Sequence, residues 1–134
     1  MTATTTPAEV LKGFWAAIDA RDWDDLEARL HPSFRAEFVH TGETFDRGSF
    51  VTLNRDYPGA WRATVEEVLA DGARAVTRTR VHNDEATFFV ASFGEVRDGL
   101  VASLVEVWAD SGATPPPATR SSAPVTRSSA PDIV

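Results

Sequence analysis

Glu106 is the residue of this chain whose type and neighbours best suit acid–base chemistry. It lies in an apolar stretch, between Val105 and Val107 and two positions before Trp108. Burial beside an indole raises the pKa of a carboxyl group, which then exchanges protons near neutral pH. Two other interpretations stay open, because a carboxylate at a strand end is often solvated or paired with an arginine of a neighbouring strand. The sequence therefore predicts Glu106 as a general acid or base, with those two alternatives.

Histidine is the second residue type that could carry a proton, and the chain has three, at His31, His40 and His82. Their spacing does not match that of metal ligands, and the chain has neither an H-E-x-x-H motif nor a glycine-rich phosphate loop. We therefore predict no metal and no cofactor. His40 shares one face of a predicted strand with Phe34 and Phe38. If that face points inward, His40 lies at the mouth of a cavity. A neutral imidazole there acts as a base or hydrogen-bond partner, and we predict His40 as the second catalytic residue.

Aromatic residues are frequent for a small chain, with four tryptophans and eight phenylalanines. Most aromatic side chains of a small domain pack in its core, but so many favour an apolar cavity that accepts a ring-shaped molecule. Asn54 and Tyr57, an amide and a phenol one helical turn apart, either line the rim of that cavity or serve as capping and packing groups. The predicted ligand-binding residues are Trp15, Phe38, Asn54, Tyr57, Trp61, Phe93 and Trp108.

A row of basic residues lies on one face of the predicted strand 74–82, at Arg74, Arg78, Arg80 and His82. We favour a surface ladder in which these arginines pair with glutamates across strands, the candidates being Glu37, Glu66 and Glu95. The alternative is an anion clamp for a carboxylate substrate. The opposite face of the strand is small and nearly uncharged, which suits a cavity wall better.

Composition narrows the class of protein. The chain has 134 residues, of which 43% are hydrophobic and 25% charged, and this corresponds to one globular domain. Its net charge of −7 argues against nucleic-acid and membrane-surface binding. The absence of cysteine excludes disulfides, thiolate zinc sites and cysteine nucleophiles. No apolar run is long enough to span a bilayer and no secretory signal is recognised, so we expect a cytoplasmic protein.

The last segment of the chain differs from the rest. Residues 113–134 are rich in Pro, Ser, Thr, Ala and Arg, and TRSSAP occurs in them twice. Too few apolar side chains are present to offset the entropy of ordering such a segment. We predict a folded domain over residues 1–112 and a disordered tail over 113–134.

The folded part changes its hydrophobic period once along the chain. Spacings of three and four residues predict helices after the Thr6–Pro7 cap, over Asp22–Leu30 and after Ser49, with one strand between the last two, at 34–40. A period of two then predicts four antiparallel strands, at Trp61–Ala70, Arg74–His82, Ala86–Val96 and Leu100–Trp108. Helices grouped before strands indicate an α+β fold, with the helices packed in a curved antiparallel sheet.

The final strand is apolar on both faces. Its alternation places Leu100, Ala102, Leu104 and Trp108 on one side with Glu106, and Val101, Val105 and Val107 on the other. A strand with one solvated face would alternate apolar and polar residues instead. We therefore predict that one face covers the helices and that the other meets a second copy of the chain, forming a homodimer through the back of the sheet.

Two segments, FWAAIDARDWDDLEARLHPSF near the start and EVRDGLVASLVEVWAD near the end, resemble the nuclear transport factor 2-like superfamily and within it the SnoaL-like branch. The resemblance covers about residues 7–112 and implies a cone-shaped α+β barrel, often dimeric, with its pocket between the helices and the sheet. It also implies a function among isomerases, cyclases, epoxide hydrolases, dehydratases and non-enzymatic binders.

The functional residues of those relatives are mostly missing at the matching positions. Phe14 stands where the isomerases have a tyrosine, Phe38 falls near their basic carboxylate, and Ala91 or Ser92 near their second acid. This argues against ketosteroid isomerase chemistry. Glu106 matches an acid that polyketide cyclases carry on the last strand. The resemblance therefore implies a small-molecule pocket protein, either a cofactor-independent isomerase, cyclase or lyase acting on a hydrophobic carbonyl compound through Glu106, or a non-catalytic ligand-binding or dimerising accessory protein.

Overall fold

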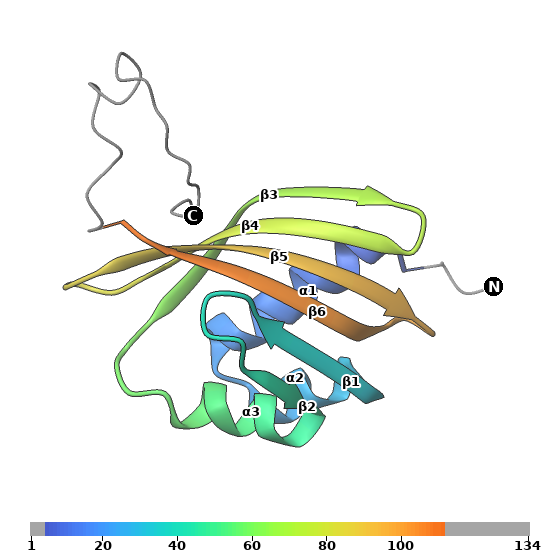
Figure 1. The fold of residues 1–134 in the computed structure, drawn as a ribbon, viewed down its shortest axis with the longest axis horizontal. Coiled ribbons are helices and arrows are strands. Elements are labelled where there is room, and N and C mark those ends of the chain that lie inside the picture. Colours follow the sequence, from blue (N-terminus) through green and yellow to red (C-terminus); the bar gives the residue numbers. More distant parts are fainter. Residues whose placement is uncertain (1–4, 112–134) are drawn as a thin grey trace, which may run out of the picture.

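The computed structural model describes residues 5–111, so the predicted tail 113–134 lies outside the described residues. Two helices, two strands and a third helix come first along the chain, and four long strands follow them (Figure 1). In chain order the elements are α1 (Pro7–Ala20), α2 (Trp23–Ala28), β1 (Leu30–Phe38), β2 (Thr44–Asp46), α3 (Arg47–Asp56), β3 (Arg62–Asp71), β4 (Arg74–His82), β5 (Thr87–Arg97) and β6 (Leu100–Asp110). The predicted α+β class is confirmed.

Helix α1 begins where its sequence predicts. The Thr6 side chain accepts a hydrogen bond from the backbone N–H of Glu9, and the Glu9 carboxylate accepts one from the backbone N–H of Thr6. This reciprocal capping box satisfies two amides that the helix itself leaves unpaired. Five residues of one stripe are buried against the sheet, at Val10, Leu11, Phe14, Trp15 and Ala17.

The segment after α2 departs from prediction. Pro32 does not end a helix but lies inside β1, which already begins at Leu30. A short strand, β2, follows β1 and was not predicted, and α3 begins earlier than expected because Asp46 is its N-cap. Ser49 is the third helical residue, and its side-chain oxygen accepts a hydrogen bond from the Asp46 backbone N–H at 3.0 Å.

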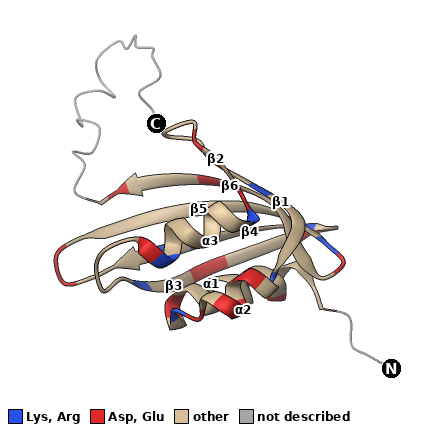
Figure 2. Ribbon diagram, turned by 90° about the horizontal axis from the view of Figure 1, so that it is seen from below, with Lys and Arg blue, Asp and Glu red and all other residues tan. Residues whose placement is uncertain are grey.

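The six strands form one open, mixed sheet in the order β2-β1-β6-β5-β4-β3. Strands β3 to β6 pair antiparallel, as predicted, whereas β1 runs parallel to β6 and places Phe38 beside Glu106. The helices cover one face of the curved sheet (Figure 1), which we call the inner face, and the opposite side is the outer face. In Figure 2 most charged positions lie on the helices, the turns and β3, while β5 and β6 are uncharged along most of their length.

One predicted alternation in β6 is wrong at its start. Val101 is fully buried in the core instead of facing outward, because the pairing of β5 with β6 shifts between Glu95 and Val96. Such a bulge adds a residue to one strand and reverses the facing of what precedes it. Beyond the bulge, Leu104, Glu106 and Trp108 face inward as the alternation requires.

Candidate functional site

A pocket of about 450 Å³ opens at one end of the inner face. Its walls come from segments far apart in the sequence: α1 and α2, the β1–β2 hairpin, α3 with the loop after it, and the ends of β4, β5 and β6. The aromatic lining residues are Trp15, Trp23, Phe38, Tyr57, Trp61, Phe88 and Trp108, joined by Ile18, Leu53, Val81 and Ala109. The polar ones are Arg21, His40, Glu43, Asn54 and Asp110. This volume lies within the range of roughly 300–1,000 Å³ typical of small-molecule sites.

Neighbouring rings form a continuous aromatic wall. Tyr57 and Trp61 have centroids 6.3 Å apart, Trp61 and Phe88 5.5 Å, Phe88 and Trp108 6.4 Å, and Trp108 and Phe38 6.3 Å. Tilted and edge-on pairs at these distances attract one another beyond simple burial. The wall therefore connects the loop after α3 with β5, β6 and β1, and holds an apolar surface for a ligand.

The polar lining residues lie mostly at the exposed mouth. Arg21 follows α1 in the left-handed conformation, and its guanidinium donates hydrogen bonds to the carbonyl oxygens of Gly59 at 2.8 Å and Trp61 at 3.4 Å. The Asn54 amide donates to the Phe50 carbonyl at 2.9 Å, which leaves its own oxygen as an acceptor. Through its two hydrogen bonds to Gly59 and Trp61, Arg21 holds the loop that carries Tyr57 and Trp61 over the pocket.

Glu106 lies behind this pocket and is 1% exposed. Its Oε1 accepts a hydrogen bond from the Trp108 indole N–H at 3.0 Å, and its Oε2 accepts one from the Ser92 hydroxyl at 3.3 Å. No lysine or arginine within residues 5–111 forms an ion pair with it. Neither alternative from the sequence holds, since the carboxyl group is neither solvated nor paired with an arginine.

Burial raises the pKa of Glu106 from its ordinary value of 4.5 to about 7, and the hydrogen bonds from Trp108 and Ser92 oppose only part of that shift. A carboxyl group without a cationic partner is costly to ionise away from water, so the neutral form is favoured. Near pH 7 both protonation states are populated, which is the condition for an acid or base that works at neutral pH.

Trp108 stands between the carboxyl group of Glu106 and the pocket. The indole lines the pocket and Glu106 does not, although the two side chains are hydrogen-bonded on the same face of β6. A ligand in the pocket therefore touches the residue that is hydrogen-bonded to the carboxyl group, while the carboxyl group itself is not part of the lining.

A row of hydroxyl groups that the sequence did not single out extends from Glu106 across the sheet. Strand register places Ser92 beside Glu106 and Thr77 beside Ser92, all buried on the inner face. Thr77 accepts a hydrogen bond from the Trp15 indole N–H at 3.2 Å. The row thus joins two tryptophans that line the pocket. In the sequence, the alternation of threonines with arginines along β4 indicates the part of this row that β4 contributes.

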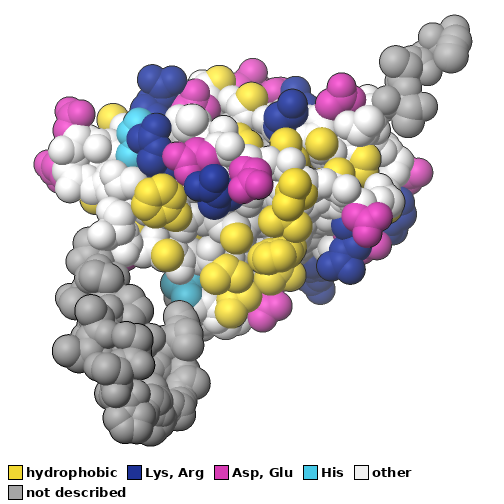
Figure 3. Space-filling model, turned by 90° about the horizontal axis from the view of Figure 1, so that it is seen from above, with side chains coloured by type: hydrophobic (Ala, Val, Ile, Leu, Met, Phe, Trp, Pro, Cys, Tyr) yellow, Lys and Arg dark blue, Asp and Glu magenta, His cyan; other side chains and the backbone are white. Residues whose placement is uncertain are grey.

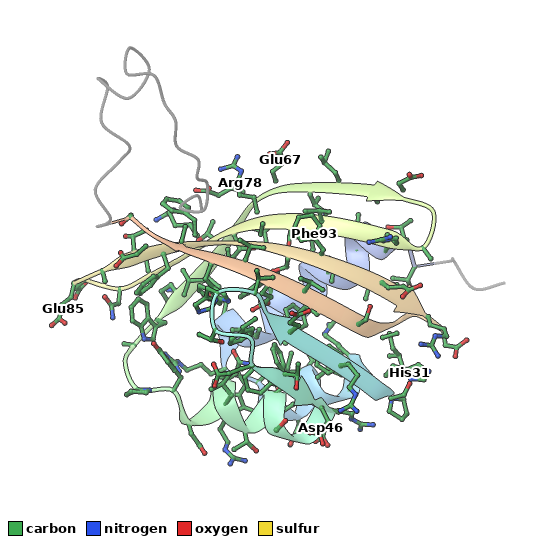
Figure 4. The ribbon with its side chains drawn as sticks, viewed as in Figure 1. His31, Asp46, Glu67, Arg78, Glu85 and Phe93 are labelled. Atoms are coloured by element: carbon green, nitrogen blue, oxygen red, sulfur yellow. The ribbon has the colours of Figure 1, made fainter. Side chains whose placement is uncertain are left out.

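The structure brings most of the predicted site residues together. Seven of the nine line the pocket: Trp15, Phe38, His40, Asn54, Tyr57, Trp61 and Trp108. Phe93 does not, because it follows the inward Ser92, is 41% exposed and lies on the outer face (Figure 4). Phe88 lines the pocket instead of Phe93. The two residues are five positions apart on β5, and residues an odd number of positions apart face opposite sides of a regular strand.

The arginines of β4 lie on the outer face, where Figure 4 shows Arg78 and Glu67 pointing away from the helices. Arg78 pairs with Glu66 at 2.8 Å and with Glu67 at 3.4 Å, and Arg80 pairs with Glu66 at 3.2 Å. These pairs confirm the surface ladder for Glu66, whereas Glu37 and Glu95 form no ion pair with these arginines among the described residues. The alternative, an anion clamp in the pocket, is left without its residues.

Two absences hold for the part of the chain that the structure describes. No group of three or more His, Cys, Asp or Glu side chains there is arranged to hold a metal ion. None of the helices there is long and apolar enough to cross a membrane.

Comparison with known proteins places this geometry in a family. A model of the SnoaL-like domain matches residues 11–104. A candidate ketosteroid isomerase from Kribbella flavida DSM 17836 has a solved structure that superposes with a TM-score of 0.78 at 28% identity, covering 92% of this chain and 90% of that one.

Two further structures are similar in fold. An LEH-like epoxide hydrolase of M. tuberculosis gives a TM-score of 0.68 at 22% identity over 79% of this chain and 84% of its own. IdmH, a candidate polyketide cyclase from Streptomyces antibioticus, gives 0.66 at 17% identity over 76% and 91%. No curated protein sequence matches this chain significantly. The chain belongs to the SnoaL-like family and has the fold of the nuclear transport factor 2-like proteins.

Proposed function

We propose that this protein binds a hydrophobic small molecule in the aromatic pocket and acts on a carbonyl group of it without a cofactor, as an isomerase, cyclase or lyase. The observation that carries the proposal is the Glu106 carboxyl group, which is buried, has no cationic partner in the described part of the chain and is hydrogen-bonded to a residue of the pocket wall. The structural relatives named as an isomerase, an epoxide hydrolase and a cyclase support small-molecule chemistry for a pocket in this position.

In this proposal Glu106 carries the proton. The carboxylate removes a proton next to the carbonyl group, or the neutral acid delivers one, and a pKa of about 7 makes both forms accessible. His40 or Tyr57 at the mouth polarises the carbonyl oxygen by a hydrogen bond. The step requires that the ligand displace the Trp108 indole, which then releases Oε1 of Glu106 for the reaction.

A second candidate is a ligand carrier without catalysis. It is favoured by one observation, that both carboxyl oxygens of Glu106 are already bonded and that the group does not line the pocket. In that case Glu106 holds Trp108 in place and the pocket only binds.

The experiment compares the wild type with Glu106→Gln, which keeps the size and the hydrogen-bond acceptor but cannot transfer a proton. A panel of hydrophobic ketones and enones is screened by quenching of tryptophan fluorescence for binding and by absorbance for conversion. We expect binding to stay within about twofold and turnover to fall by about 10²–10⁴-fold. Glu95→Gln on the outer face is the matched control and should change neither quantity.

The outcomes separate the two candidates. Unchanged turnover in a folded Glu106→Gln protein would exclude the catalytic role of this residue. Binding of panel compounds by the wild type without conversion of any of them would favour the carrier.

We further propose that two copies pair through the outer face. Register places Leu69, Val76, Phe93 and Val105 in one row across β3, β4, β5 and β6. Figure 3 shows hydrophobic side chains gathered in the middle of this face with charged groups beside them. Such a patch is a usual mark of an interface. Sedimentation of the wild type should give twice the chain mass, and Phe93→Lys should give the monomer; a monomeric wild type at tens of micromolar would refute the pairing.

A further inference from the structure

Three of the four indole groups that line the pocket donate their N–H groups to the protein, whereas the Trp23 N–H has no hydrogen-bond partner among the described residues. Trp15 donates its N–H to Thr77 at 3.2 Å, Trp61 to the Pro58 carbonyl at 2.8 Å, and Trp108 to Glu106 at 3.0 Å. At these three tryptophans a ligand therefore meets the electron-rich rings and not the hydrogen-bond donors. Donation to an acceptor also polarises the ring, which adds to its attraction for a positive charge.

The loop that carries Trp61 is built to hold this ring in place. Gly59 has φ +110°, and a side-chain carbon added there would come within 2.6 Å of the Trp61 Nε1 atom. Arg21 ties the same loop to the end of α1 through two carbonyl oxygens. Since the loop is fixed from both sides, the Trp61 ring surface is presented to the pocket before any ligand arrives, which reduces the entropy lost on binding.

The charges around the pocket are negative on balance. The lining includes two acidic side chains, Glu43 and Asp110, against one basic side chain, Arg21. The Arg21 guanidinium donates hydrogen bonds to two backbone carbonyls of the loop after α3. The whole chain carries a net charge of −7. This field opposes an anionic ligand and attracts a cationic one.

We propose that the ligand of this pocket is a hydrophobic organic cation, with a tertiary or quaternary ammonium group held against the aromatic wall. The proposal rests on the proposed binding function and adds the chemical class of the ligand. Tryptophan and tyrosine rings surrounding an ammonium group replace its water by cation–π contacts, and nearby carboxylates complement its charge. An apolar body attached to that group fills the rest of the aromatic cavity.

The test uses two probes of equal shape and different charge. Benzyltrimethylammonium and neopentylbenzene differ in having a positive nitrogen or a neutral carbon at the same position. Titration of the full chain, followed by tryptophan fluorescence and by calorimetry, should show the cation binding about tenfold more tightly or better, in spite of its stronger hydration.

Two charge variants provide the internal control. Glu43→Gln removes one negative charge from the mouth, whereas Glu67→Gln removes one from the outer face, where Glu67 pairs with Arg78. We expect Glu43→Gln to weaken binding of the cation about two- to threefold and to leave the neutral probe unaffected. Glu67→Gln should leave both probes unaffected, and circular dichroism verifies that each variant is folded.

Each outcome bears on a different statement. Tighter binding of the cation, reduced by Glu43→Gln alone, supports the proposal. Equal affinity for the two probes overturns the cationic ligand and leaves the hydrophobic pocket standing. Failure of both probes to bind overturns the cationic ligand and also contradicts small-molecule binding in this pocket.

Discussion

Two glutamates on the same sheet show how strongly its two faces differ. Glu66 on the outer side of β3 is partly exposed and pairs with two arginines, Arg78 and Arg80. Glu106 on the inner side of β6 is 1% exposed, and its only partners among residues 5–111 are an indole N–H and a hydroxyl. On the exposed outer face, arginines and water stabilise the ionised form of a carboxyl group. On the buried inner face, neutral hydrogen-bond donors do not compensate for the loss of water, so the pKa of the carboxyl group rises.

The aromatic residues divide in the same way. Phe14 on α1 is fully buried and packs against Trp15 and Phe50, with ring centroids 5.3 and 5.9 Å away. Phe93 on β5 is 41% exposed. Residue type alone therefore does not decide a role in this protein, because the position of a ring in the fold decides whether it packs in the core, lines the pocket or lies exposed on the outer face.

The largest effect should come from truncating a buried ring. We expect Phe14→Ala to lower the free energy of unfolding by about 3–5 kcal/mol, since it removes a large side chain and leaves a cavity. Leu69→Ala on the outer face, where Leu69 is 64% exposed, should cost less than about 0.5 kcal/mol. Urea unfolding at low protein concentration measures both, and similar losses would mean that the two faces are not distinguished by burial.

The next effect concerns the pH dependence of stability. The folded-state pKa of Glu106 is raised to about 7, so between pH 4.5 and 7 the folded protein holds a proton that the unfolded chain releases. Stability from this group is therefore present at low pH, declines as the pH rises, and levels off above pH 7. The wild type should lose about 2–3 kcal/mol relative to Glu106→Gln between pH 5 and pH 8.

Denaturant unfolding of both proteins at several pH values measures that difference directly. Carboxyl groups whose pKa is lowered by their partners, such as Asp19 beside Arg62, affect the wild type and the variant equally and cancel in the comparison. Parallel curves for the two proteins would show that Glu106 ionises at its ordinary pH and is not enclosed.

The smallest effect is expected for the outer-face glutamate. Glu66→Gln should change the free energy of unfolding by less than about 1 kcal/mol, because Arg78 and Arg80 are partly exposed and water screens the pairs. Added salt should shrink even this difference. A loss as large as that of Phe14→Ala would identify the arginine ladder as a main source of stability.

Local patterns predicted much of the fold. The Thr6–Pro7 cap, the apolar stripe of α1 and the alternation of β3 to β6 depend on neighbours in sequence, and each appears in the structure within a few residues. The parallel pairing of β1 with β6 and the short strand β2 were missed. Such pairings join segments far apart in the chain, and β2 is too short to show a period.

By itself, the amino-acid sequence determined which side chains alternate along β4 and along β6 beyond its bulge. It thereby separated the arginines of β4 from its buried threonines and placed Glu106 among apolar neighbours. Only the tertiary structure decided that Trp108 stands between Glu106 and the pocket, that Ser92 and Thr77 extend the buried row, and that Phe93 lies outside it. Periodicity is a property of adjacent residues, whereas a pocket arises from the packing of distant ones. Its depth, its charge and the access to its acid therefore exist only once helices and sheet have come together.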